Sequence, residues 1–395
     1  MIKVLLAWPP YIPSYLNLCY HYTDFGEVAG YLKNQEDIEI KVLDGGVVNL
    51  LWSDFTKELT KNYDVLIIIN HFDNIRDVRK LAEYSKEISP NTKILTYGRI
   101  SAYIPEYFKK YLVDAIIYSG DWEIVIKKYL DFIQNKCRIK ELSGLFIRKD
   151  NRWIKTKHGE LLSQSKWSFP ALDILPLNDY FKYEKELSFT ISKGCPFNCI
   201  FCPVPHIQGI KDRRREINSA LDFIEKAISK YNFDYVSMFS ATFTFDREYV
   251  VRLCNEIRKR KMHFKWKCVT HPNCVDKELL TLMGKSGCFR ISFGIETLEK
   301  NVQKNIGKYI TEKRLGNIIK WCLNNDIQPL CFLMSGIPGE TEKDITYATK
   351  KILSLGGKVR VTVYTPYHKL FSKMGEEEVM SFSKRIVHLD EIIKQ

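Results

Sequence analysis

Three cysteines lie within eight positions near the middle of the chain: Cys195, Cys199 and Cys202. The surrounding stretch ISKGCPFNCIFCP, residues 191 to 203, contains two prolines, which are typical of a loop rather than of a packed core. Structural zinc sites normally use four protein ligands, and the nearest fourth candidate is His206. Three thiolates suit an iron–sulfur cluster in which one iron keeps a position for another ligand. The spacing therefore favours a cluster over zinc, a disulfide or simple packing.

Short apolar, β-branched runs alternate with helical patterns in the second half of the chain, and the cysteines directly follow the first run. We expect strands at residues 187–194, 235–240, 264–270, 289–296, 329–337 and 358–366. Six such units predict a partial (β/α)6 barrel over residues 187–371, followed by a short helical tail at 372–395. Active sites of barrels lie at the carboxyl ends of the strands, which is where the cysteines are expected. The first helix should begin at Ser219, with Asp222 completing a capping pair.

The first part of the chain has a similar alternation. Strands are predicted at residues 2–8, 38–44, 64–69, 92–98 and 114–120, and one of the intervening helices at 75–88. This order predicts a doubly wound, Rossmann-like parallel sheet over residues 1–135, which would bind a ligand at the carboxyl ends of its strands. Residues 136–186 lose the alternation and are expected to form a linker that contains a hairpin.

The composition is that of a soluble globular protein with two domains: 395 residues, 45% hydrophobic and 27% charged. The net charge of +13 comes from dispersed lysines, so a nucleic-acid partner is not favoured, whereas an anionic cofactor or substrate is compatible with it. The amino terminus, MIKVLLAWPPYIP, has the pattern of neither a signal peptide nor a membrane span. We therefore expect a cytoplasmic protein without a membrane partner, whose eleven cysteines are thiols rather than disulfides.

The cysteine spacing, the aromatic Phe201 before the last cysteine and the place after the first barrel strand together resemble the radical S-adenosylmethionine (radical SAM) superfamily. The resemblance implies a 4Fe-4S cluster held by Cys195, Cys199 and Cys202, with S-adenosylmethionine chelating the fourth iron. It also implies an electron donor such as flavodoxin or ferredoxin, and a 5'-deoxyadenosyl radical that abstracts hydrogen from the substrate. The protein would position and shield that chemistry.

Two later motifs extend the resemblance along the barrel. GIET, residues 294–297, resembles the fourth-strand motif, from which Glu296 would contact the ribose or amino group of S-adenosylmethionine. SGIPGET, residues 335–341, resembles the fifth-strand motif, whose backbone around Ile337 would meet the adenine. The order of these motifs behind the cysteines is the strongest sign of the superfamily.

Two other segments depart from the superfamily's pattern. FSATFTFD, residues 239–246, has Ser240 and Thr242 where relatives often have acidic residues that bind the methionyl amine. On the third strand, His271 stands where relatives often have an arginine, which indicates a weaker carboxylate contact or a role near the substrate.

A doubly wound domain before such a barrel resembles the cobalamin-binding class of the superfamily. The resemblance places the loops after the front strands against the corrin, with contacts from Pro10, Asn70, Gly98, Arg99, Gly120 and Glu123. No histidine has the Asp-x-His-x-x-Gly pattern that ligates cobalt in proteins similar to methionine synthase, since His21 and His71 lack both the aspartate and the glycine. The lower face of cobalt would then meet water, an apolar surface or another group.

The other cysteines separate this chain from a neighbouring branch. Methylthiotransferases of the superfamily carry three further cluster cysteines in front and an RNA-binding domain behind, whereas the front part here holds only Cys19 and Cys137. We expect most of the remaining cysteines to be core residues; they are Cys254, Cys268, Cys274, Cys288, Cys322 and Cys331. A place for Cys331 in the barrel cavity stays open.

The resemblance implies a cobalamin-dependent methyltransferase that acts on an unactivated carbon, or on phosphorus, of a small-molecule, peptide or carrier-bound substrate. One alternative is a radical rearrangement, cyclisation or oxidation, with or without cobalamin. An alternative of another class is a cobalamin-sensing binding protein with a structural cluster. Candidate substrate neighbours are Tyr364, Tyr367 and His368, which follow the last predicted strand.

Overall fold

The computed structural model describes residues 1–10, 18–48, 50–197, 199–383, 386–388 and 392. The chain divides into two compact units. The front unit comprises Met1–Glu184, His206–Gln208 and Pro366–Ser383, and the barrel unit comprises Lys185–Pro205, Gly209–Thr365 and Lys384–Gln395.

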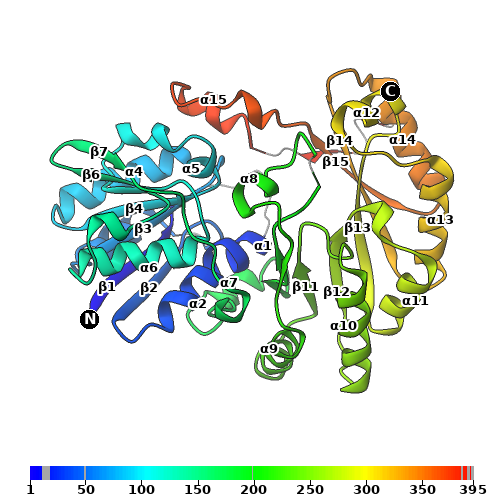
Figure 1. Cartoon of the computed structure of the whole chain (residues 1–395), viewed down its shortest axis with the longest axis horizontal. Coiled ribbons are helices and arrows are strands. Elements are labelled where there is room, and N and C mark those ends of the chain that lie inside the picture. Colours follow the sequence, from blue (N-terminus) through cyan, green and yellow to red (C-terminus); the bar gives the residue numbers. More distant parts are fainter. Residues whose placement is uncertain (11–17, 49, 198, 384–385, 389–391, 393–395) are drawn as a thin grey trace. The chain divides into compact units, whose positions relative to one another are not determined.

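A seven-stranded sheet forms the centre of the front unit, in the order β2-β1-β3-β4-β5-β6-β7 (Figure 1). Its strands are β1 (Ile2–Trp8), β2 (Ile38–Asp44), β3 (Val65–Asn70), β4 (Lys93–Gly98), β5 (Ala115–Ile117), β6 (Leu145–Lys149) and β7 (Arg152–Lys155). The first five strands are parallel, which confirms the predicted doubly wound sheet. Every residue of β3 is buried, as expected for a central strand covered on both faces.

The predicted hairpin forms, but it belongs to this sheet rather than to a separate linker. Strand β6 pairs antiparallel with β5, with Phe146 opposite Ile116, and β7 then pairs with β6. The edge of β5 has unpaired backbone groups that a further strand can satisfy, so the hairpin extends the sheet.

Helices cover the front sheet: α1 (Leu18–Tyr20), α2 (Glu27–Lys33), α3 (Trp52–Leu59), α4 (Ile75–Ile88), α5 (Arg99–Tyr103), α6 (Trp122–Ile133) and α7 (Leu177–Tyr180). A π-helical turn, His21–Gly26, joins α1 to α2. Helix α4 has the predicted bounds, and its buried residues Ile75, Val78, Leu81, Ala82 and Ser85 follow the helical period.

The segment after the last barrel strand packs into the front unit. Tyr367, Met374, Val379 and Phe382 are buried in the front core. In the described part of the tail that was predicted as helical, one short helix, α15 (Glu376–Met380), is followed by β16 (Ile386–Val387), which pairs antiparallel with β15 (Lys358–Val363). Tyr367 is a core residue of the front unit, stacked on Tyr103 with 5.3 Å between ring centroids, and its place beside a substrate stays a prediction.

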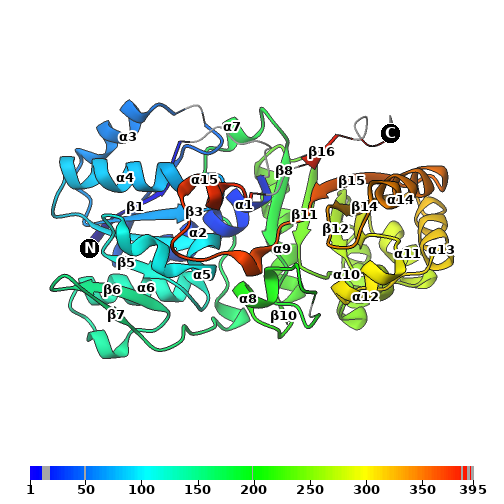
Figure 2. The same ribbon diagram turned by 90° about the horizontal axis from the view of Figure 1, so that it is seen from above.

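The barrel unit contains six parallel strands followed by β16, in the order β8-β11-β12-β13-β14-β15-β16. They are β8 (Glu186–Thr190), β11 (Tyr235–Phe239), β12 (Trp266–Thr270), β13 (Cys288–Glu296), β14 (Gln328–Ser335) and β15 (Lys358–Val363). Strands β8, β11, β12, β14, β15 and β16 are labelled in Figure 2, and β13 in Figure 1. A two-stranded ribbon, β9 (Ser192–Lys193) with β10 (Arg213–Arg214), flanks the cysteine loop. Six parallel strands confirm the partial barrel.

Each barrel strand except the last is followed by at least one helix: α8 (Val204–Gln208), α9 (Ile217–Lys230), α10 (Arg247–Lys259), α11 (Lys277–Lys285), α12 (Lys300–Ile306), α13 (Glu312–Leu323) and α14 (Glu342–Ser354). The predicted cap of α9 at Ser219 is wrong. The helix begins at Ile217, and the Glu216 carboxylate accepts the backbone N–H of Ser219. A longer acidic side chain thus caps the helix three residues earlier than expected and satisfies one of its free N–H groups.

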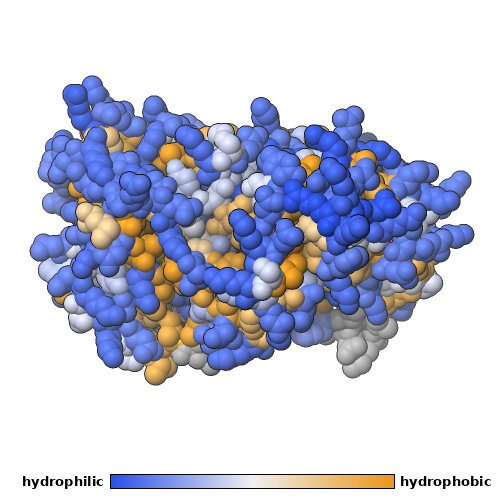
Figure 3. All heavy atoms as spheres, turned by 90° about the horizontal axis from the view of Figure 1, so that it is seen from below, coloured by the Kyte–Doolittle hydropathy of each residue, from blue (hydrophilic) through white to orange (hydrophobic). Residues whose placement is uncertain are grey.

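The predicted core cysteines are confirmed for the most part: Cys254, Cys268, Cys288, Cys322 and Cys331 are buried, and Cys274 is half-buried. Among the helices that the structure describes, none is long and apolar enough to cross a membrane. Figure 3 shows one face of the molecule, where hydrophilic residues predominate and hydrophobic ones form small groups between them.

Candidate functional site

The cysteine loop begins directly after β9 and is held by its own backbone. Gly194 has φ +85°, and a Cβ there would collide with the Lys211 carbonyl, so this turn requires glycine. The N–H of Cys195 donates to the Gly209 carbonyl at 3.1 Å, and the N–H of Cys202 donates to the Cys199 carbonyl at 3.0 Å. These contacts bring three thiols into one short loop at the carboxyl end of β8.

The Cys199 thiol is partly buried and lies close to several charged or ionisable side chains. Burial raises the pKa of the Cys199 thiol to about 11, the Lys308 ammonium opposes this rise, and charges at Cys202, Glu296 and Cys195 add to it. Among the described residues, no group of three or more His, Cys, Asp or Glu side chains has the geometry of a metal site. Three soft sulfur donors in one loop nevertheless fit an iron–sulfur cluster by their chemistry, because binding a metal deprotonates such thiols.

Glu296 ends strand β13 in an unusual conformation. Its φ is +68°, in the left-handed region, and the pairing of β13 with β14 shifts register beside it. Its carboxylate lies 2.8 Å from the ammonium of Lys308, and both side chains are about 10% exposed. A Cβ at Gly294 would lie 2.5 Å from Glu296 Oε1, so the small residue in this motif makes room for the pair. Backbone strain of this kind often marks a functional site.

Lys308 was missed by the sequence argument. Helix α12 ends before Gly307, whose φ of +70° turns the chain so that Lys308 follows directly. The buried Gln303 side chain donates to the carbonyls of Thr297 and Ile310, and the N–H of Lys308 donates to the Gln303 carbonyl. Nothing in the sequence distinguishes Lys308 among the 60 lysines and arginines of the chain.

An apolar wall stands beside this charged pair. Val302, Ile306, Met334 and Ile337 are buried together, with Phe201 and Tyr364 packed against them. The Lys308 ammonium lies 5.9 Å from the centre of the Phe201 ring. The structure thus brings Phe201, Glu296 and Ile337 into one region with Lys308, and it places Tyr364 in the wall. His368 is exposed in the turn that follows.

Ser240 and Thr242 are occupied by contacts within the loops. The hydroxyls of Ser240 and Ser192 are 2.6 Å apart, and the N–H of Thr242 donates to Ser240 Oγ at 3.2 Å. The Thr242 hydroxyl lies 3.6 Å from the sulfur of Cys195. They therefore support the cysteine loop from the neighbouring strand, and their contact with a cofactor stays a prediction.

Two histidines near the loop have different surroundings. His271 stacks on Phe197 of the cysteine loop at 4.7 Å, and its Nδ1 accepts the N–H of Asn273 at 3.1 Å. Burial, and secondarily Lys308, lower the pKa of His271 to about 4, so it is a neutral donor through Nε2–H. His206 Nε2 bonds to the Ala102 carbonyl at 2.7 Å, so this nitrogen is already used and does not provide the fourth zinc ligand.

Glu340, in the fifth-strand motif, is a second residue that the sequence argument missed. Both of its carboxylate oxygens are buried and make no hydrogen bond of good geometry. Burial raises the pKa of Glu340 to about 7, although the Thr297 hydroxyl and the nearby amides of Gly336 and Ile337 oppose the rise. An ionisable group of this kind at the carboxyl ends of strands is a candidate for a functional role.

At the front sheet, the strand order places the change of winding direction between β1 and β3, where such sheets bind their ligands. Asn70 ends β3, but its amide is used within the protein: it donates to Thr96 Oγ1 and accepts the N–H of Ser101. Gly98 has φ +143°, and a Cβ there would collide with the Asn70 backbone. Of the predicted corrin contacts, Asn70 and Gly98 therefore hold the strand ends together.

The other predicted contacts lie in different places. Pro10 is half-buried beside Gly45, where a Cβ would collide with the proline backbone. Gly120, with φ +89°, packs against Gly159 of the segment after the hairpin, and Glu123 is buried on α6. Arg99 pairs with Asp24, 3.1 Å from its carboxylate. None of these placements tests cobalamin binding, which stays a prediction for these residues.

A buried polar network at the same edge was missed by the sequence argument. Asp44, at the end of β2, accepts three hydrogen bonds: from His21 at 2.8 Å, from the Tyr180 hydroxyl at 2.5 Å and from the N–H of Gly46 at 3.0 Å. The His21 ring stacks on Trp8 with 3.9 Å between centroids. Because these residues are far apart in the sequence, no local pattern indicates the network.

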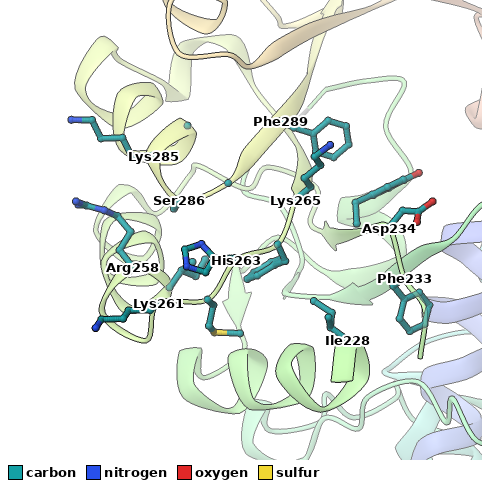
Figure 4. A pocket seen from close by; sticks show the side chains of 16 residues that line it. Ile228, Phe233, Asp234, Arg258, Lys261, His263, Lys265, Lys285, Ser286 and Phe289 are labelled. Carbon is teal, nitrogen blue, oxygen red and sulfur yellow. The ribbon is translucent and has the colours of Figure 1, made fainter. Parts of the chain in front are cut away.

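A hollow of about 1180 Å³ lies at the opposite, amino ends of β11, β12 and β13. Figure 4 shows its basic side chains, Arg258, Lys261, His263, Lys265 and Lys285, with Asp234 as an acidic neighbour. Active sites of barrels form at the carboxyl ends of strands, so this hollow is separate from the cysteine loop and is not the candidate site.

Comparisons with known proteins agree with this geometry. Residues 189–352 match the model of the Radical SAM superfamily. An uncharacterized methyltransferase of Pyrococcus horikoshii is 23% identical over 376 residues, which cover 93% of this chain and 81% of that protein. Cytidylyl-2-hydroxyethylphosphonate methyltransferase of Streptomyces wedmorensis is 23% identical over 308 residues, which cover 69% of this chain and 57% of that protein.

A solved structure is similar over most of the chain. TsrM from Kitasatospora setae, a radical S-adenosylmethionine methyltransferase bound to tryptophan and a cofactor analogue, has a TM-score of 0.76 and 15% identity, covering 92% of this chain and 73% of that protein. A second TsrM structure contains cobalamin and a [4Fe-4S] cluster and has a TM-score of 0.74. At this identity, the likeness concerns the fold.

Proposed function

We infer that the chain is a radical SAM enzyme, since residues 189–352 match that superfamily, and we propose that it is a cobalamin-dependent methyltransferase. The observation that carries the proposal is that one cysteine loop, whose Cys199 thiol senses the charges of Glu296 and Lys308, lies with this pair and an apolar wall at the carboxyl ends of one set of strands. Thiols could hold a cluster, a charged pair could bind a zwitterionic cofactor, and an apolar wall could take a purine.

Each side chain has a role in this proposal. Cys195, Cys199 and Cys202 would hold the cluster, which, with S-adenosylmethionine bound, supplies the electron that generates a carbon-centred radical. The ammonium of Lys308 would bind the methionyl carboxylate, and Glu296 would bind the ribose hydroxyls or the amine. Phe201 and Ile337 would enclose the adenine and exclude water from it. Thr242 would keep Cys195 in place.

Cobalamin is proposed for the front sheet on three grounds. The winding change between β1 and β3 creates a ligand position there, and His71, which follows β3, has a buried ring nitrogen without a hydrogen bond. An unsatisfied polar atom at such a place fits a bound group. TsrM, which shares the fold, has a structure with cobalamin.

The partners follow from the chemistry. The proposed reaction needs an electron donor, for which flavodoxin or ferredoxin is suitable, and a substrate that offers an unactivated carbon or phosphorus. A small molecule, a peptide or a carrier-bound substrate each remains compatible with the site. Methyl transfer consumes two S-adenosylmethionine molecules: one donates the methyl group and becomes S-adenosylhomocysteine, and one is reduced to methionine and 5'-deoxyadenosine.

The two products give a direct test. We expect anaerobic protein with cobalamin, a chemical reductant and S-adenosylmethionine to release both S-adenosylhomocysteine and 5'-deoxyadenosine, measured by mass spectrometry. Omitting cobalamin should remove only the first product. Formation of 5'-deoxyadenosine alone, even with cobalamin bound, would contradict methyl transfer and favour a radical rearrangement, cyclisation or oxidation.

A further inference from the structure

His71 occupies a special position in the front sheet. It directly follows β3, one of the two strands that border the change of winding direction. A ligand of such a sheet lies in the crevice beyond these strand ends. The backbone N–H of His71 donates to Asn74 Oδ1 at 2.8 Å, so the chain holds the residue firmly at this place.

The imidazole of His71 is enclosed but not fully used. Its ring centre lies 4.9 Å from Trp8 and 5.7 Å from Tyr20. Its Nε2 is buried without a hydrogen bond, and the closest carboxylate, on Asp24, is 3.6 Å away. The ring therefore has a nitrogen available for another group.

Burial is the main reason why His71 is neutral. Burial lowers the pKa of His71 to about 4, and the nearby Arg99 adds to this effect while Asp24 opposes it. Burial opposes ionisation of Asp24, but Arg99 and His71 lower the pKa of this carboxyl overall. Arg99 thus compensates the charge of the Asp24 carboxylate that lies beside the imidazole. A neutral imidazole is the form that binds metals.

The second buried histidine of this edge provides a contrast. His21 Nδ1 bonds to Asp44 at 2.8 Å, and its ring stacks on Trp8 at 3.9 Å with only 14° between the planes. Its carboxylate partner also accepts the Tyr180 hydroxyl. His21 is therefore fixed within the protein, whereas His71 has the weaker contacts of a group that can meet a ligand.

We propose that a ring nitrogen of His71 is the protein ligand to the lower face of cobalt when cobalamin is bound at the front sheet. This inference rests on the proposed function and assigns a residue to it. The carboxylate that orients the imidazole comes from the π-helical turn before α2, not from the position two residues before the histidine. A local Asp-x-His-x-x-Gly pattern is thus unnecessary, because the tertiary structure supplies the acidic partner.

Isotope labelling tests this assignment in the intact protein. The chain would be produced with 15N-labelled histidine, loaded anaerobically with unlabelled cobalamin and reduced to the cobalt(II) form. In the electron paramagnetic resonance spectrum, a nitrogen ligand splits each cobalt line into a triplet, and a 15N ligand splits it into a doublet. We expect the doublet, because the labelled nitrogen belongs to the protein and not to the benzimidazole of the cofactor.

Two variants assign the signal to one residue. His71→Phe keeps an aromatic ring between Trp8 and Tyr20 and should lose the doublet, whereas the matched His158→Gln change, at an exposed histidine of the same unit, should retain it. The labelled wild-type protein is decisive even if a variant fails to fold, since bound corrin without an isotope effect overturns this inference alone. Absence of corrin from the protein would overturn the proposed cobalamin dependence as well.

Discussion

The carboxyl edges of the two sheets carry their polar side chains in different ways. At the barrel edge, the cysteines and Glu296 belong to short motifs in which residues close in sequence share one loop or strand end. At the front edge, Asp44, His21 and Tyr180 come from three distant segments and are joined by buried hydrogen bonds. The cysteines and Glu296 at the barrel edge are therefore specified by local sequence, whereas Lys308 and the front edge depend on tertiary contacts.

This difference predicts how each edge responds to substitution. Changes to the cysteines at the barrel edge should remove the cluster and leave the fold intact, because these residues lie in a loop. Changes at the front edge should reduce stability, because its groups are buried and satisfy one another.

The largest effect is expected for the cysteines. Replacing Cys195, Cys199 and Cys202 by Ala should remove the cluster iron and reduce 5'-deoxyadenosine formation to background, since no thiolate ligand remains. Iron analysis and product quantification after anaerobic purification provide the measurement. The front sheet holds none of these ligands, so the variant should still bind cobalamin. A variant that keeps its iron would show that the cluster is held elsewhere.

Lys308 should have the next largest effect. Lys308→Met leaves the buried Glu296 carboxylate without its cation and removes the proposed contact to the methionyl carboxylate, so S-adenosylmethionine should bind about 10- to 100-fold more weakly. The matched change Lys308→Arg keeps the charge and should recover most of the affinity. Equilibrium dialysis with labelled S-adenosylmethionine measures both. Equal affinity of the Met variant and the wild type would remove Lys308 from the site.

At the front edge, Asp44→Ala should destabilise the protein by about 2–5 kcal/mol, because it leaves the buried His21 and Tyr180 groups without an acceptor. The milder Tyr180→Phe change removes one of these donors and should cost about 1 kcal/mol. Urea unfolding at constant pH provides both values. If Asp44→Ala were as mild as Tyr180→Phe, the network would not be the cooperative unit that the contacts indicate.

The smallest effect concerns the dependence of stability on pH through Glu340. Its pKa is raised to about 7 in the folded protein, so the folded state retains the proton more strongly than the unfolded state does. Its contribution to stability is complete below the ordinary pKa of a glutamate and is lost as the pH rises toward 7. Replacing Glu340 by Gln should flatten that part of the curve.

Thermal unfolding between pH 5 and pH 8 would compare the two proteins. Above pH 7 the Gln variant should be at least as stable as the wild type, because a neutral amide replaces a buried charge. Parallel curves for the two proteins would mean that Glu340 does not titrate in this range.

Comparing the predicted elements with the observed ones shows which features can be predicted from the sequence. The strands and α4 were predictable because each has its own apolar periodicity, and the cysteine loop because its spacing is local. The place of the β6–β7 hairpin was not, since only its pairing with β5 shows that it extends the sheet. The cap of α9 was misplaced because Glu216 and Ser219 both offer suitable side-chain oxygens, and backbone geometry decides between them.

The residues of the two sites that the sequence did not reveal were missed for a common reason. Lys308 reaches Glu296 only because Gly307 turns the chain after α12. Asp24 approaches His71 because the π-helical turn places it beside the end of β3. In both cases the partner is distant in sequence and has no motif of its own, so only the folded chain shows the pair.

The central claim is that one chain holds a cluster at the barrel edge and cobalamin at the front edge. The most direct test is the cobalt and iron content, with the ultraviolet–visible spectrum, of protein purified anaerobically from cells supplied with cobalamin. Corrin bands together with a cluster shoulder, and one cobalt for each chain, are the predicted result. A cluster without corrin or cobalt would contradict the account, because the front edge would then have no cofactor to carry a methyl group.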